Sequence, residues 1–156
     1  MKIRRKKLLI VISVIIGVVT VLYLSKAFSY TPSIVNGISE FRQMELGGIQ
    51  QTIMIRGENL YNPILLYLHG GPGTTELIPF RLAHRNLEKY FTIVSWEQRG
   101  TGKSYNSNIM PESMSVEQFI ADTHQLTEYL LKSFSKTKLL LVGHSWGSAL
   151  GLLTAN

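Results

Sequence analysis

The sequence predicts an α/β domain with a largely parallel β-sheet and flanking helices, preceded by a transmembrane helix. An uncharged apolar run at residues 8–24 supports the transmembrane helix. Beyond it, strand-like and helix-like segments alternate, which is the pattern of a parallel sheet covered by helices. Three glycine-rich segments, at residues 69–73, 98–104 and 143–147, each follow an apolar strand-like run. Ligands bind at the carboxyl ends of strands in such sheets, so these three loops are expected to form one site.

The expected elements can be placed in chain order. They are strands at 38–46, 49–56 and 64–68, a helix at 76–89, a strand at 91–96, a helix opening at Ser115, a strand at 138–142 and a helix from Trp146 onward. Gly47-Gly48 suits the tight turn of a hairpin between the first two strands. Ser115-x-x-Gln118 matches a capping box, a common helix start.

The N-terminal segment reads as a membrane anchor. Seventeen residues, 8–24, pass without a charge, and as a helix they would span roughly 26 Å at ~1.5 Å per residue. Five Lys/Arg residues precede the run and one follows it, which predicts a cytoplasmic N-terminus and a folded part on the outer side. The run exceeds the ~7–15 residues of a signal-peptide core, which favours an uncleaved anchor. Cleavage at Ser25-Lys26-Ala27 is the alternative, and would give a secreted domain.

The distribution of charge along the chain argues against nucleic-acid binding. We assign residues 1–30 to the basic flank and anchor, and residues 31–156 to one domain. Six of the sixteen Lys/Arg residues lie in the first segment, and the other ten balance the ten Asp/Glu of the second. The domain therefore has no nucleic-acid footprint, and Arg81, Arg85 and Lys89 are expected to form a solvated face.

No metal or cofactor is expected. The chain has no cysteine, which excludes disulfides, thiolate ligands and a cysteine nucleophile. The spacing H-E-x-x-H is absent, and residues 100–104, although they read Gly-Thr-Gly-Lys-Ser, lack the spacing of a phosphate-binding loop.

Gly143-His144-Ser145-Trp146-Gly147 is a G-x-S-x-G pentapeptide between an apolar strand and a helix. A sharp turn of this kind holds the central serine above the sheet, and directs the next backbone N–H at the reacting carbonyl. Ser145 is therefore the candidate nucleophile, with the N–H of Trp146 in support. Gly143 and Gly147 are expected where the turn packs closely against backbone. The alternative is an ordinary Gly/Ser turn.

The segment His69-Gly70-Gly71-Pro72-Gly73 leaves its backbone uncovered after a buried strand. A loop of this composition can aim an amide N–H at a developing oxyanion. Our candidate is the N–H of Gly71, paired with that of Trp146. His69 is expected to order the loop by hydrogen bonding. The alternative is a simple strand-to-helix turn.

Three motifs together resemble a known family. HGGPG at 69–73, EQRGTGKS at 97–104 and GHSWGS at 143–148 resemble the α/β-hydrolase fold, and most nearly its proline iminopeptidase-like branch. The resemblance extends over about residues 35–156. It implies that Ser145 is the nucleophile, that Gly71 and Trp146 form the oxyanion hole, and that residues 97–104 are a structural turn near the site floor. Glu97 stands where the family usually has Asp.

The resemblance also implies a reaction class. We expect acyl transfer to water on a small peptide or ester, as in an aminopeptidase or esterase. A serine at the elbow argues against dehalogenase or epoxide-hydrolase chemistry, which needs a carboxylate nucleophile.

The acid and the histidine of the triad follow the serine in this fold. The eleven residues after Ser145 contain no His, Asp or Glu, so the acid and base are expected to be absent from this chain. His84 and His124 are expected on helices away from the site, and the side chain of His144 is expected to point away from Ser145. Asp122 is expected to be solvated or capping.

Three hypotheses follow. The sequence is the N-terminal half of a membrane-anchored serine hydrolase, without the cap and the C-terminal strands. Alternatively, it is a catalytically inactive, membrane-tethered fragment or binding protein, or a second chain completes the fold. If the 156 residues stand alone, the strand at 138–142 is expected to lie at a sheet edge and to lower the stability of the domain.

Overall fold

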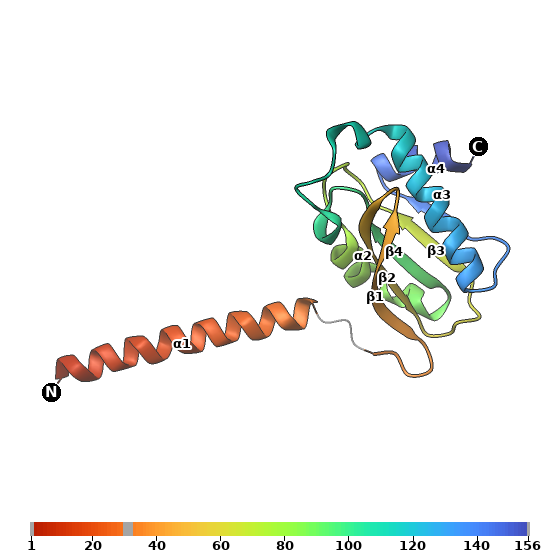
Figure 1. The fold of residues 1–156 in the computed structure, drawn as a ribbon. Helices are drawn as coiled ribbons and strands as arrows, with labels where there is room; N and C mark the ends of the chain where they lie inside the picture. Colours follow the sequence, from red (N-terminus) through yellow and green to blue (C-terminus); the bar gives the residue numbers. More distant parts are fainter. Residues whose placement is uncertain (1, 30–32, 156) are drawn as a thin grey trace. The chain divides into compact units, whose positions relative to one another are not determined.

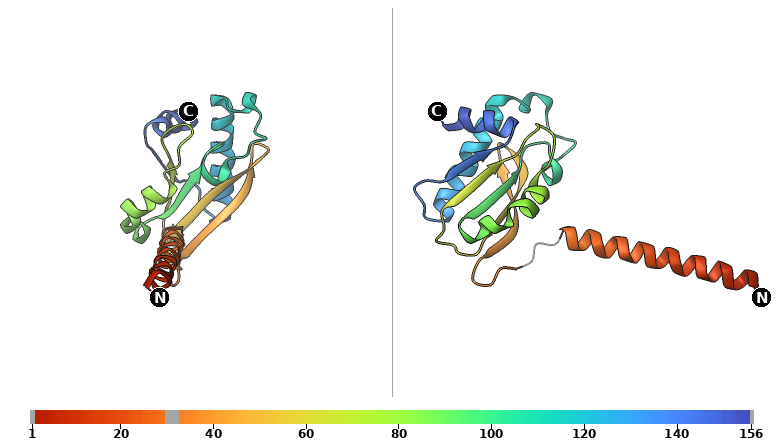
Figure 2. Two further views of the ribbon diagram at one scale, coloured as in Figure 1. Left: turned by 90° about the vertical axis from the view of Figure 1, so that its left-hand side faces the viewer. Right: turned by 180° about the vertical axis from the view of Figure 1, so that it is seen from behind.

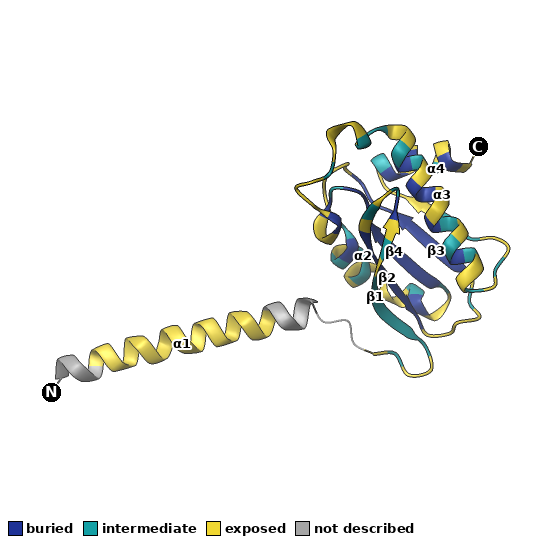
Figure 3. Ribbon diagram, viewed as in Figure 1, coloured by how far each residue is buried: buried dark blue, intermediate teal, exposed yellow. Residues whose placement is uncertain are grey.

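The computed structural model describes residues 2–29 and 33–155, and its chain divides into two compact units, Met1–Thr31 and Pro32–Asn156. The first unit contains one helix, α1 (Lys2–Ser29). Its stretch Lys6–Leu24 has a mean hydropathy of 2.6 and is fully exposed (Figure 3). By length and composition this stretch suits a membrane span, and a signal sequence has the same properties.

The second unit is built on a five-stranded mixed sheet in the order β1-β2-β4-β3-β5 (Figure 1). The strands are β1 (Ile38–Leu46), β2 (Ile49–Gly57), β3 (Ile64–Leu68), β4 (Thr92–Glu97) and β5 (Leu140–Gly143). β1 and β2 form the predicted hairpin, and β2 pairs antiparallel with β4. β3 runs parallel to both β4 and β5. The predicted hairpin and parallel strands are confirmed, with strand ends shifted by one or two residues.

Helices cover both faces of this sheet (Figure 2). The helices are α2 (Leu77–His84), α3 (Val116–Ser133) and α4 (Trp146–Ala155), with short 3₁₀ turns at Arg85–Lys89, Gly102–Ser104 and Pro111–Ser113. The predicted helix at 76–89 is thus an α-helix only to His84 and continues as a 3₁₀ turn. Ser115 caps α3 by accepting a hydrogen bond from the N–H of Gln118 at 3.2 Å. The side chain of Gln118 instead bonds Asp122, so only half of the predicted capping box forms.

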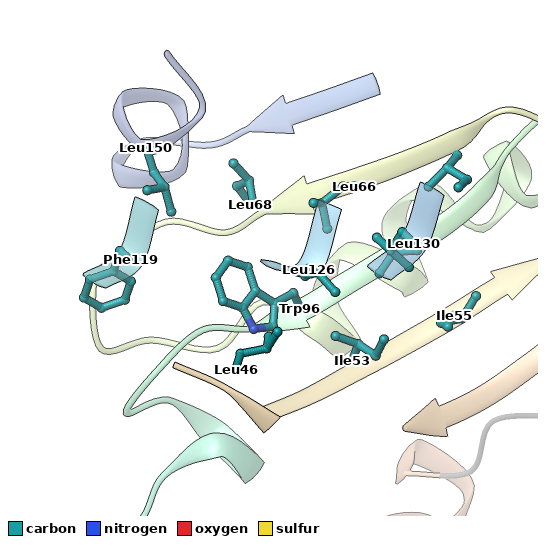
Figure 4. Packing of buried hydrophobic residues seen from close by; sticks show 12 residues of the cluster. Leu46, Ile53, Ile55, Leu66, Leu68, Trp96, Phe119, Leu126, Leu130 and Leu150 are labelled. Atoms are coloured by element: carbon teal, nitrogen blue, oxygen red, sulfur yellow. The ribbon is translucent and has the colours of Figure 1, made fainter. Parts of the chain in front are cut away.

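The core lies in two clusters, one on each face of the sheet. On one face, α3 and α4 pack over residues that include Leu66, Leu68 and Trp96 (Figure 4). On the other, Phe80 of α2 packs over Leu65 and Tyr67. Alternate residues of β3 therefore enter opposite clusters, as expected for a strand covered on both faces.

Candidate active site

The three glycine-rich loops meet at the carboxyl ends of β3, β4 and β5, and Gln98 joins them. Its backbone N–H donates to Nε2 of His69 at 3.1 Å, and its side-chain amide donates to the His69 carbonyl. Its side-chain oxygen accepts from the indole N–H of Trp146 at 3.0 Å. Gln98 is fully buried, so these bonds are shielded from water. Sequence reasoning predicted the meeting of the loops but not the residue that joins them.

Ser145 occupies the turn between β5 and α4 with a φ of 51°. A non-glycine residue in this left-handed region is strained, and such strain concentrates at functional sites. Both flanking glycines are required by packing. A Cβ on Gly147 would overlap the carbonyl of Leu68, and a Cβ on Gly143 would overlap the backbone of Gly147. The local geometry is the sharp, closely packed strand-to-helix turn that a nucleophile elbow requires; we call it the elbow.

The loop after β3 lies directly beside this turn. A Cβ built on Gly70 would lie 3.4 Å from Cβ of Ser145. Gly71, the next residue, has a φ of 121°, which favours glycine. Among residues 33–155, the backbone N–H groups of Gly71 and Trp146 donate no hydrogen bond. The two predicted oxyanion donors are therefore both available.

His69 orders this loop, as predicted from the sequence. It is buried, and its Nδ1 lies 2.6 Å from the carbonyl oxygen of Gly70. Because Nε2 accepts the N–H of Gln98, the neutral ring must carry its proton on Nδ1 and donate it to that carbonyl. Burial lowers the pKa of His69, and outweighs the opposing hydrogen bond to Gly70 and the charges of Glu76 and Glu97. His69 is thus a neutral structural residue.

Glu76 links the loop after β3 to the elbow, and sequence reasoning missed it. Its carboxylate accepts hydrogen bonds from the hydroxyl of Tyr67 and from the N–H of Gly70, and it lies 3.0 Å from Nδ1 of His144. Burial raises the pKa of Glu76, but the hydrogen bonds from these groups lower it further, to below its ordinary value. Burial and the neighbouring carboxylate raise the pKa of Tyr67. Glu76 is therefore held as a carboxylate.

Asp122 is not solvated or capping, and that prediction was wrong. It is fully buried and forms an ion pair with Arg99, with both of its oxygens 3.0 Å from guanidinium nitrogens. Gln51 and Gln118 donate to the same carboxylate at 2.6 and 2.8 Å. Arg99 also donates to the carbonyl of Gly47, so the pair ties the loop after β4 to the β1–β2 hairpin.

Glu97 supports the same loops. Its carboxylate accepts from the backbone N–H of Lys103 at 2.6 Å and from the hydroxyl of Thr75 at 2.7 Å. It therefore closes the turn that follows β4 and ties this turn to the loop after β3. This role fits the structural turn that the resemblance implied for residues 97–104.

Within residues 33–155, no histidine hydrogen-bonds to Ser145. The ring of His144 pairs with Glu76 instead, and His124 is exposed on α3. His84 lies nearer the site than expected, because it lines an open groove of about 330 Å³ together with Glu76 and His144. Its ring packs against Phe80, at 4.7 Å between centroids.

A comparison with known protein families assigns residues 63–156 to the α/β hydrolase fold. The chain belongs to this family. Among curated proteins, it is 49% identical over 115 residues to a probable aminopeptidase, YbaC, of Bacillus subtilis, and 30% identical over 115 residues to a proline iminopeptidase of Lactobacillus helveticus. These alignments cover 74% and 71% of this chain but 36% of each relative. The chain thus spans about a third of the length of the curated relatives it matches.

Solved structures agree on the fold. A proline iminopeptidase-related protein of Thermus thermophilus matches with a TM-score of 0.64 and 24% identity, over 76% of this chain and 40% of its own. Epoxide hydrolase A of Mycobacterium thermoresistibile matches with a TM-score of 0.59 and 21% identity, over 76% of this chain and 35% of its own. At these identities the likeness concerns the fold alone.

Proposed function

We propose that this chain contributes the nucleophile and the oxyanion hole of a membrane-anchored serine hydrolase that removes N-terminal residues from small peptides. Ser145 is the nucleophile, and the N–H groups of Gly71 and Trp146 stabilise the oxyanion. The observation that carries this proposal is the elbow: Ser145 is held at a φ of 51° beside Gly70, and the N–H groups of the residues that follow each of them, Trp146 and Gly71, donate no hydrogen bond among the described residues.

The chemistry follows from the elbow. The hydroxyl oxygen of Ser145 attacks the carbonyl carbon of the scissile bond and its proton passes to a base, which gives a tetrahedral oxyanion. Donors that are already in place stabilise that charge without reorganisation. Collapse of the oxyanion expels the leaving group and forms an acyl-enzyme, which water then hydrolyses. A serine at this position suits acyl transfer and not epoxide opening, although an epoxide hydrolase shares the fold.

The base and the acid are proposed to come from outside these 156 residues. No histidine in the described domain reaches Ser145, and the family places both partners after the serine. A longer form of the same chain would supply them most simply. The second route is another polypeptide that pairs with β5.

The substrate proposal rests on the relatives. Two of them are named as a probable aminopeptidase and a proline iminopeptidase. An esterase is the alternative within the same reaction class. The anchor proposal rests on helix α1, whose exposed apolar stretch follows a basic flank. It leaves the domain outside the cytoplasm, either tethered or released by cleavage near Ala27.

The test is to label the native protein, in the length at which it occurs in a membrane fraction, with a fluorophosphonate probe. We expect labelling of the wild type and none of Ser145→Ala, together with a loss of hydrolysis of about 10⁴-fold or more. Ser148→Ala is the matched control, because Ser148 lies one turn away and its hydroxyl donates only to the carbonyl of Gly143. Labelling that survives in Ser145→Ala would overturn the assignment.

Substrate class is tested on the same preparation. Aminoacyl arylamides with a free amine are compared with their N-acetylated forms and with simple aryl esters. An aminopeptidase hydrolyses only the free-amine compounds, whereas an esterase hydrolyses the esters regardless of the amine.

A further inference from the structure

The end of the domain opposite the candidate active site is strongly basic. Four segments meet there, at residues 33–37, 57–63, 85–91 and 133–139. Their contacts include Glu58 N–H to the Glu88 carbonyl at 2.8 Å and Lys136 Nζ to the Tyr61 carbonyl at 2.8 Å. We call this end the amino-edge face, because β3 and β4 begin there. Its basic residues are Arg81, Arg85, Lys89, Lys132, Lys136 and Lys138.

Few acidic groups offset these charges. Glu88 is already neutralised by Arg56, in a buried pair with nitrogen–oxygen distances of 2.7 and 3.0 Å. Glu58 is the other carboxylate on the four segments. Lys132 and Arg81 lie in the last turns of α3 and α2, where a positive charge interacts favourably with the helix C-terminus, and this interaction explains why basic residues stand at these two positions. It does not account for the remaining four residues.

The opposite end of the domain has the opposite sign. Around the three active-site loops lie Glu76, Glu97, Glu112 and Glu117, against the exposed Lys103. Arg99 and Asp122 cancel each other in their buried pair. The domain as a whole is therefore nearly neutral but polarised, basic at the amino-edge face and acidic at the catalytic end.

A cavity on the amino-edge face gathers the basic groups beside the point where the domain begins. It is about 660 Å³ and open, and Ser33–Asn36 line it together with four basic residues, Arg56, Arg81, Arg85 and Lys89, and the two carboxylates of Glu58 and Glu88. Arg81 is crowded there, since burial and the charges of Arg56 and Arg85 lower its pKa against the opposing charge of Glu88. Its Nε is buried without a hydrogen-bond partner among the described residues. An anion in this cavity would relieve that crowding.

We propose that the amino-edge face docks on the anionic lipid headgroups of the membrane in which helix α1 is anchored. This rests on the membrane anchor of the proposed function. Eight residues of sequence lie between Leu24 and Ser33, so nine Cα–Cα steps join them, and the chain can hold this face no more than about 30 Å from the bilayer. Electrostatic attraction between the basic face and the lipid headgroups acts over about 10 Å. The tether raises the local concentration of the domain at the membrane, so that the face comes within this range.

Docking by this face has a functional consequence. The catalytic loops lie at the carboxyl ends of the same strands that begin at the amino-edge face. A domain held by its basic end therefore presents Ser145 and the acidic loops to the medium, away from the negative lipid surface. Each basic residue near such a surface shifts the ratio of docked to free domain by about fivefold.

The experiment compares two single-cysteine variants of this cysteine-free chain, labelled with a fluorescent dye and reconstituted in vesicles. Asn86→Cys lies in the basic cavity, and Asn108→Cys lies in an exposed loop at the catalytic end. The vesicles contain phosphatidylcholine alone or with phosphatidylglycerol, and the lipid headgroups carry a quencher. We expect phosphatidylglycerol to increase quenching at residue 86 and not at residue 108, and high salt to abolish the difference.

Charge reversal provides the matched control. We expect Arg85→Glu to lower the docked-to-free ratio about 25-fold, since it removes one positive charge and adds one negative charge. Lys103→Glu, the same change at the catalytic end, should leave quenching at residue 86 unchanged. Equal quenching at both positions, or quenching at residue 86 that is insensitive to Arg85→Glu, would overturn the proposal.

Carbonate extraction of the same vesicles separates this proposal from the anchor. If the chain resists extraction, the quenching result decides the docking. If it is extracted, the anchor proposal fails, and docking is decided by flotation of the chain with the vesicles at low salt. Flotation that requires phosphatidylglycerol and is lost in Arg85→Glu would still support the face, and flotation independent of both would overturn it.

Discussion

Strands β3 and β5 lie side by side, and each leads into a loop of the candidate active site, yet they are enclosed very differently. Every residue of β3 is buried. In β5, Leu140 and Val142 are 48% and 39% exposed, because β3 is the one strand that pairs with it in the described sheet. The strand that leads into the loop at residues 69–73 is fixed from both sides, whereas the strand that leads into Ser145 is fixed from one.

This difference shows where the order of the site comes from. The loops after β3 and β4 are joined to each other and to the hairpin by buried polar contacts through Gln98, Glu97 and Arg99. The elbow depends on β3: the N–H of His144 donates to the Leu68 carbonyl at 3.0 Å, and Gly147 packs against the same carbonyl. Variants that remove one of these supports test the comparison directly.

The largest expected effect comes from the buried ion pair that supports the loop after β4. Asp122→Ala leaves the guanidinium of Arg99 buried without its carboxylate, and we expect it to lower the free energy of unfolding by about 3–5 kcal/mol. Glu128→Ala on the same helix, at an exposed position, should change it by less than about 0.5 kcal/mol. Chemical denaturation measures both. A similar, small effect of the two variants would show that the buried pair does not hold the loop.

A matched pair of leucines tests the enclosure of the two strands. Leu66→Ala in β3 opens a cavity in the core, and we expect a loss of about 2–5 kcal/mol. Leu140→Ala in β5 removes a half-exposed side chain and should cost less than about 1 kcal/mol in the 156-residue chain. In a longer form whose further strands cover β5, the Leu140 effect should rise toward that of Leu66. Equal costs in the 156-residue chain would contradict the difference between the strands.

The sequence was most informative where structure depends on local spacing. Ser145 and its flanking glycines, the His69 loop and the Ser115 cap were all predicted, because each is defined by residues a few positions apart. Glu76 and Asp122 were missed because their partners lie far along the chain, His144 for the first and Arg99 for the second. One signal for Asp122 was present: it lies three residues after Phe119 and four before Leu126, on the apolar face of α3.

Two glycines of α4 test how closely the elbow depends on β3. Gly147→Ala forces a methyl group onto the Leu68 carbonyl, so we expect a loss of at least about 1–3 kcal/mol and slower labelling of Ser145. Gly151→Ala is the control, because its methyl group would meet Cδ1 of Leu68 at an ordinary 3.6 Å. That change should stabilise the helix by about 0.5–1 kcal/mol. Equal effects of the two variants would mean that the elbow can move away from β3 without cost.

The smallest effect concerns Glu76, the residue that joins the loop after β3 to the elbow. Glu76→Gln keeps the size of the side chain but removes the charge that faces His144 and the N–H of Gly70. We expect labelling of Ser145 in the native protein to slow by about tenfold at neutral pH, because the loop at residues 69–73 and the elbow lose their common support. Glu128→Gln should label at the wild-type rate.

The pH dependence of stability separates this role of Glu76 from simple loss of packing. The pKa of Glu76 is depressed in the folded state, so its carboxylate stabilises the fold above the ordinary carboxyl pKa. That contribution is lost as the pH falls through the depressed value. The difference in unfolding free energy between wild type and Glu76→Gln should therefore be largest near neutral pH and shrink in acid. A difference that stays constant across this range would mean that the variant acts through shape alone, and that the charge of Glu76 does not hold the two sides of the site together.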